Sequence, residues 1–68
     1  MDNNSFPKIL RLKGVMDITK MSRSAIYLGM AEDAFPTQIK LGKRSVGWLE
    51  HEIYDWVQAR IAESRSAA

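Results

Sequence analysis

The segment SRSAIY, residues 22–27, gathers two serines, an arginine and a tyrosine where a short helix is predicted to begin. Ser22 suits an N-cap, because its hydroxyl oxygen can accept from the amide of Ser24 or Ala25. At about 100° per residue, Ser24 and Tyr27 fall on the outward side of the helix. The Tyr27 ring could lie against a sugar-phosphate backbone or a thymine methyl, or it could pack back on a later hairpin. These residue types make nucleic-acid binding one candidate function.

Catalysis would need a constellation that the sequence lacks. His51 is the only histidine; it falls in the first turn of a predicted helix, off the apolar stripe, and is expected to face solvent. The carboxylates form neither a HExxH motif nor a paired-acid arrangement, and the glycines do not form a phosphate loop. There is no cysteine to act as a nucleophile or to bind zinc. We therefore predict no catalytic residue, no metal site and no cofactor.

The 68 residues allow one small domain, and a chain of this size buries only about 60% of the surface that its unfolded form exposes. No apolar run approaches the roughly 20 residues that cross a bilayer. The start, MDNNSFPKIL, has no leader-like pattern, so a cytoplasmic protein is expected. Residues 1–8 are predicted to be a flexible arm, residues 9–65 the folded domain and residues 66–68 a frayed tail.

Charge is distributed unevenly along the chain. Residues 8–48 hold eight basic side chains against three acidic ones, whereas residues 49–68 hold four acidic side chains against two basic ones. This distribution indicates one face turned toward a polyanion and another turned away from it. Charges that are merely scattered and solvated are the alternative.

Two helices and a tight turn are predicted before residue 36. Val15 and Ile18, three residues apart, indicate a first helix with one buried stripe, preceded by a very short strand near Ile9. Only a tight turn fits between this helix and Ser22, which is helix-turn-helix spacing, although many helical hairpins with this spacing bind no DNA. Gly29 lies on the buried side of the second helix, where it would admit close approach of the first helix.

A β-hairpin is predicted next. Ile39 and Leu41, then Val46 and Trp48, alternate with polar residues or glycine around a four-residue loop, GKRS, with Gly42 at the bend. The loop tip is basic, which either protects an edge strand from aggregation or forms a DNA-binding wing. The basic residues of the hairpin are Lys40, Lys43 and Arg44.

A helix of about 14 residues should follow from Leu49, because apolar residues recur at helical spacing as far as Ile61. Trp48 and Trp56 fall on core-facing positions, which favours packing over a stacking platform for single strands. The final SRSAA is predicted to fray.

The stretches SRSAIY at 22–27, FP at 35–36 and KLGKRSVGWLEHEI at 40–53 resemble the AlpA family of phage and prophage regulators, which are close to excisionase and MerR-type domains. The similarity runs from about residue 9 to residue 65. It implies a mainly α fold with a small β-hairpin, a winged helix-turn-helix of three helices plus a wing. Two departures are Leu28, where many members have arginine, and Asp33–Ala34, where many have glycine and a basic residue.

The resemblance implies a sequence-specific regulator of a prophage or integrated element, with the second helix in the major groove and the wing on the backbone or minor groove. Partners would be double-stranded DNA, integrase or RNA polymerase, or further copies binding cooperatively. Alternatives are an excisionase-type directionality factor that bends attachment-site DNA, or a protein-interaction module without DNA binding. Expected DNA contacts are Ser22, Arg23, Ser24, Tyr27 and Leu28 in the helix, and Lys20, Lys40, Lys43 and Arg44 in the turn and wing.

Overall fold

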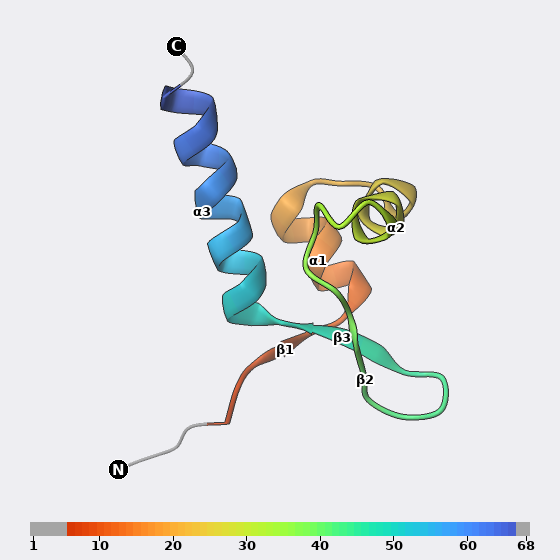
Figure 1. Ribbon diagram of the computed structural model, residues 1–68. Helices are drawn as coiled ribbons and strands as arrows, with labels where there is room; N and C mark the ends of the chain where they lie inside the picture. Colours follow the sequence, from red (N-terminus) through yellow and green to blue (C-terminus); the bar gives the residue numbers. More distant parts are fainter. Residues whose placement is uncertain (1–5, 67–68) are drawn as a thin grey trace.

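The computed structural model describes residues 6–66, which form three helices and three short strands (Figure 1). The predicted arm and tail therefore lie partly outside the described residues. The elements, in chain order, are β1 (Ile9–Leu10), α1 (Leu12–Thr19), α2 (Arg23–Ala31), β2 (Ile39–Lys40), β3 (Val46–Leu49) and α3 (Glu50–Ser66). The predicted fold class, a mainly α winged helix-turn-helix, is confirmed.

The strands form one antiparallel sheet in the order β1-β3-β2. Ile9 and Leu10 of β1 pair with Leu49 and Trp48, so the predicted N-terminal strand does more than precede the first helix: it joins the hairpin as a third strand. Gly47, at the centre of β3, permits this approach, since a Cβ there would stand 2.7 Å from the Ile9 Cγ2 atom and 3.0 Å from the Leu10 carbonyl oxygen.

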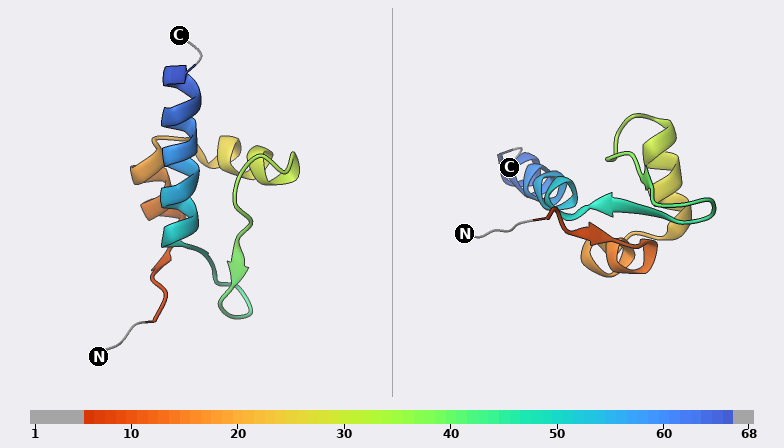
Figure 2. Two further views of the ribbon diagram at one scale, coloured as in Figure 1. Left: turned by 60° about the vertical axis from the view of Figure 1, so that its left-hand side comes forward. Right: turned by 90° about the horizontal axis from the view of Figure 1, so that it is seen from below.

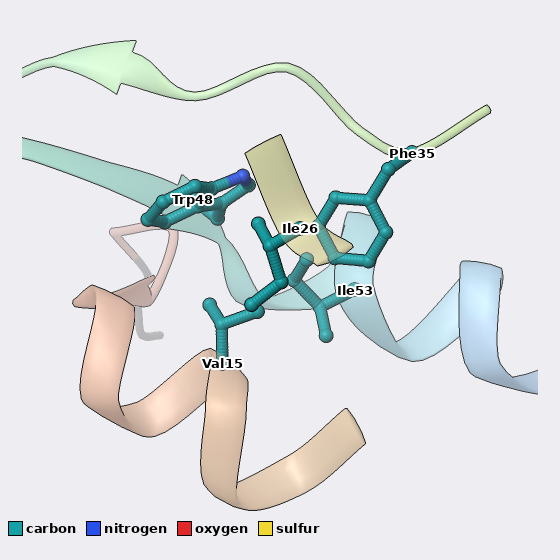
Figure 3. Packing of buried hydrophobic residues seen from close by; sticks show 5 residues of the cluster. All are labelled: Val15, Ile26, Phe35, Trp48 and Ile53. Carbon is teal, nitrogen blue, oxygen red and sulfur yellow. The ribbon is translucent and has the colours of Figure 1, made fainter. Parts of the chain in front are cut away.

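The core is a cluster of five apolar side chains, each from a different segment (Figure 3). Trp48 from the sheet is fully buried, which confirms its predicted place in the core. Trp56 is partly buried and packs against the cluster. The five members are Val15, Ile26, Phe35, Trp48 and Ile53.

The turn between α1 and α2 is as tight as predicted. Lys20 ends α1 in the left-handed conformation, with φ of 62°, and its amide donates to the Met16 carbonyl oxygen at 2.8 Å. The Thr19 hydroxyl donates to the Val15 carbonyl oxygen and accepts from the Met21 amide, which links both sides of the turn. Helix α2 therefore starts in a direction set by backbone and side-chain hydrogen bonds.

Two packing predictions for the helices are wrong. Ile18 was expected in the buried stripe, but it is 50% exposed, because the side of α1 that faces the core is occupied by Val15 together with the partly buried Leu12 and Met16. Gly29 was expected to admit α1, but the side chain that it faces belongs to Phe35, in the loop after α2.

The hairpin and the last helix differ in extent from the prediction. β2 ends at Lys40, one residue before Leu41, and no glycine among residues 6–66 takes a positive φ, so Gly42 does not make the bend by a left-handed conformation. The Ser45 carbonyl oxygen closes the loop by accepting from the amides of Leu41 and Gly42. α3 begins at Glu50 rather than Leu49 and continues to Ser66, through residues that were expected to fray.

Candidate nucleic-acid interface

Helix α2 presents its N-terminal end to solvent. The Ser22 Oγ atom accepts from the Ala25 amide at 3.1 Å, which confirms the predicted N-cap. This bond uses a lone pair of the hydroxyl and leaves its hydrogen able to donate. Arg23, Ser24 and Leu28 are all exposed, and the first turn contains no acidic residue. The N-terminal end of α2 therefore offers hydrogen-bond donors, and its first turn contains no carboxylate.

Tyr27 is only half-buried, so its ring neither enters the core nor stands clear of the surface. The Arg23 guanidinium carbon lies 5.7 Å from the centre of the Tyr27 ring, a cation–π distance. This contact orients the arginine over the ring and reduces the number of conformations that it samples. Arg23 and Tyr27 thus form one composite surface at the margin of α2.

The loop between β2 and β3 is the second basic feature. Lys43 and Arg44 in this loop and Lys40 at the end of β2 are exposed, as the wing hypothesis requires, and Lys20 is exposed in the turn before α2. The loop projects beyond the sheet, with α3 at the opposite end of the molecule (Figure 2, right). Positive side chains are thus available at the tip without competing core contacts.

Arg11 is a residue of this surface that the sequence reasoning missed. Its Nε atom donates to the Val46 carbonyl oxygen at 3.0 Å, which joins the start of α1 to the base of the hairpin. The bond leaves the two terminal guanidinium nitrogens for other partners. The signal in the sequence was a basic residue next to a predicted short strand. The sequence alone does not indicate that the hairpin packs beside this residue.

Both tryptophans form hydrogen bonds to the segment that connects α2 to β2. The Trp48 indole nitrogen donates to the Pro36 carbonyl oxygen at 3.1 Å, and the Trp56 indole nitrogen donates to the Ala34 carbonyl oxygen at 2.9 Å. Phe35, between these two acceptors, packs edge-on against Trp56 with the ring centres 4.8 Å apart. This segment sets where α2 lies relative to the hairpin.

The start of the same segment needs an unusual backbone. Asp33 has a φ of 59°, in the left-handed region that glycine or asparagine occupies most easily. The next amide, of Ala34, donates to the Gly29 carbonyl oxygen at 2.7 Å and so closes the end of α2. Glycine would therefore suit position 33 for a structural reason, independent of any contact with a ligand.

Residues 6–66 contain no group of three or more potential metal ligands, and none of their helices is long and apolar enough to cross a membrane. His51 is exposed, as predicted. Within the described chain, the outward face of α2 and the basic hairpin hold most of the residues that the sequence predicts to contact DNA.

Three helices, a tight turn before α2 and a hairpin beside it define the winged helix-turn-helix class. The family described as prophage CP4-57 regulatory protein (AlpA) matches residues 8–61. This chain belongs to the AlpA family.

Two curated relatives are similar over most of the chain. "Uncharacterized protein ORF88" of Enterobacteria phage P4 is 40% identical over 55 residues, which cover 81% of this chain and 62% of the phage protein. "DNA-binding transcriptional activator AlpA" of Escherichia coli (strain K12) is 39% identical over 66 residues, which cover 88% of this chain and 94% of that protein. The chain thus spans under two thirds of the length of the phage relative.

Proposed function

We propose that this chain is a sequence-specific double-stranded DNA-binding regulator of a prophage or integrated element. The observation that carries the proposal is the exposed start of α2, where Arg23 and Ser24 stand free of acidic neighbours in the first turn. The printed description of the Escherichia coli relative, a DNA-binding transcriptional activator, supports the same class of function.

In this proposal α2 enters the major groove. Arg23 pairs with the N7 and O6 atoms of a guanine or with a phosphate, and Ser24 donates to or accepts from a base edge. Ser22 donates its free hydroxyl hydrogen to a phosphate while it caps the helix. Tyr27 and Leu28 supply apolar contact, for example with a thymine methyl.

The hairpin loop supplies contacts that do not depend on base sequence. Lys40, Lys43 and Arg44 reach phosphates or an adjacent minor groove, and Lys20 reaches a phosphate beside the start of α2. Each phosphate that such a side chain neutralises releases counterions, so affinity should fall steeply with salt.

A helix as short as α2, with nine residues, spans roughly 14 Å at 1.5 Å per residue and reads one short stretch of groove. Useful specificity then requires several copies on adjacent sites, or a protein partner such as integrase or RNA polymerase. An excisive role, in which the protein directs integrase at the attachment site, uses the same DNA-binding surface as a transcriptional role.

The test is fluorescence anisotropy at two salt concentrations with random duplex and with fragments from the protein's own promoter, the nearest integrase gene and the attachment site. Arg23→Ala and Ser24→Ala should weaken specific binding more than random binding. Lys43→Ala and Arg44→Ala should weaken both and flatten the salt dependence. Preference for the attachment-site fragment over the promoter and integrase-gene fragments would favour the excisive role.

Two outcomes would contradict the proposal. If all four variants bind every fragment as the parent does, α2 and the hairpin are not the contact surface. If the parent binds no duplex at either salt concentration, the chain is better explained as a protein-interaction module that uses its acidic last helix.

A further inference from the structure

Helix α3 carries an apolar surface that the core does not use. Its last turns extend away from the other elements (Figures 1 and 2), and residues 58–66 are all exposed. Tyr54 is 62% exposed and Ile61 is 39% exposed. Beside them a groove runs between α1 and α3, lined mainly by Ile18, Ile53, Tyr54 and Val57, of which Ile18 is half-exposed.

The exposed residues of α3 follow a spacing that places them on one face. Tyr54 and Ile61 are seven residues apart, nearly two full turns, and Val57 lies between them at the edge of the groove. Glu50 comes four residues before Tyr54, and Arg65 comes four residues after Ile61. The face therefore begins with a negative side chain, continues with apolar ones and ends with a positive one.

We propose that this face binds a second copy of the chain, with the two α3 helices antiparallel about a two-fold axis between Val57 and Gln58. In that single register Tyr54 lies opposite Ile61 of the partner subunit, and Glu50 lies opposite Arg65 of the partner subunit. Because the axis is two-fold, each pair forms twice. The same register thus matches apolar with apolar at Tyr54 and Ile61 and negative with positive at the two ends, and it places Val57 opposite Gln58 of the partner subunit at the centre.

A parallel arrangement of two such helices does not match in this way. A parallel pair would place each Glu50 opposite its own copy at one end and each Arg65 opposite its own copy at the other, which repel. In the antiparallel pair, Ile61 of the partner subunit also lies near the groove beside Ile18, which explains the exposed isoleucine of α1 that the core leaves unused.

The dimer leaves the proposed DNA-binding surface free. The hairpin loop and α2 lie on the side of the molecule away from α3 (Figure 1; Figure 2, right). The inference does not rest on DNA binding, because it depends only on α1 and α3. A failure of either proposal therefore leaves the other standing.

The first experiment is sedimentation velocity of the full chain over a range of concentrations. The mass should rise from that of the 7.7 kDa monomer to twice that value. Tyr54→Lys and Ile61→Lys should each weaken the dimer by about tenfold or more, because each places a charge where an apolar side chain was buried. The control is Ala59→Lys, which adds the same side chain at an exposed position on another side of α3. Circular dichroism should show the same helix content in all four proteins.

The second experiment tests the direction and register. The chain has no cysteine, so Tyr54→Cys and Ile61→Cys chains can be mixed and oxidised without background. The antiparallel register predicts a disulfide between the two different variants in preference to disulfides between identical ones. A monomer at every concentration, an equal effect of Ala59→Lys, or a dominant Tyr54→Cys homodimer would each overturn the proposal.

Discussion

Gly29 and Phe35 approach each other so closely that a Cβ at position 29 would stand 2.9 Å from the Phe35 Cβ atom. Real carbon atoms do not approach that closely without a shift, and the atom in the way belongs to the stem of a buried ring rather than to a flexible end. The absence of a side chain at position 29 thus lets the segment after α2 fold back onto that helix.

The variant Gly29→Ala tests this relationship. The clash should cost about 1–3 kcal/mol, and the better helix propensity of alanine should offset about 1 kcal/mol of that loss. The matched control is Gly14→Ala in α1, where the new Cβ would meet Leu10 at an ordinary 3.6 Å. Urea unfolding should therefore show a loss of stability at position 29 and no loss, or a gain of up to about 1 kcal/mol, at position 14. Equal effects at both positions would contradict the close packing.

The N-cap of α2 should contribute measurably to stability. Ser22→Ala removes the acceptor for the Ala25 amide, and the expected loss is about 1 kcal/mol. Ser24→Ala is the control, because Ser24 is exposed and already inside the helix, where alanine is favourable. Thermal unfolding followed by circular dichroism distinguishes the two; a Ser22→Ala variant as stable as Ser24→Ala would mean that the cap bond contributes nothing.

The two indole hydrogen bonds should differ in their effect on stability. Trp48→Phe leaves a partly buried Pro36 carbonyl oxygen without its donor, and it also removes part of a fully buried ring, so we expect a loss of about 2 kcal/mol. Trp56→Phe should cost about 1 kcal/mol, since the exposed Ala34 can bond to water instead. Chemical unfolding of both variants measures the difference. The reverse order would indicate that Trp56, rather than Trp48, is the main anchor of the segment.

Arg11 should contribute to DNA affinity without contributing to base preference. Arg11→Ala removes a cation at the base of the hairpin and the bond that joins α1 to it, so specific and random duplexes should lose affinity alike. The slope of log K against log salt should fall by about one. Arg60→Ala is the control, because it removes the same charge from α3, where Arg60 pairs with Glu63. A salt slope that Arg11→Ala and Arg60→Ala change equally would exclude a local role for Arg11.

The parts of the fold that local sequence determines were predictable. The Ser22 cap depends on neighbours three residues away, and the alternation around Val46 and Trp48 follows directly from strand geometry. Phe35 and Arg11 show why the rest was not. Phe35 contacts Gly29 and Trp56, and Arg11 contacts Val46. These contacts depend on how separate elements pack against one another, and no local periodicity of the sequence encodes that.

The candidate site was likewise predictable from the sequence only in part. The exposure of Ser24, Lys43 and Arg44 could be expected from helical phase and from a loop position. The half-buried state of Tyr27 and the arginine above its ring could not, because they depend on which rotamers the finished surface admits. Which of these residues touches DNA remains a prediction, and the binding experiments test it.

The last strand passes into the last helix without a linker, since β3 ends at Leu49 and α3 begins at Glu50. The end of β3 therefore fixes the direction in which each side chain of α3 points. A single residue inserted between them would turn α3 by about 100° and advance it by about 1.5 Å relative to the sheet. Such an insertion would move Ile53 out of the core and turn every side of the helix to a new direction, even though no residue was replaced. Natural length variation should consequently be tolerated in the hairpin loop but not at this junction.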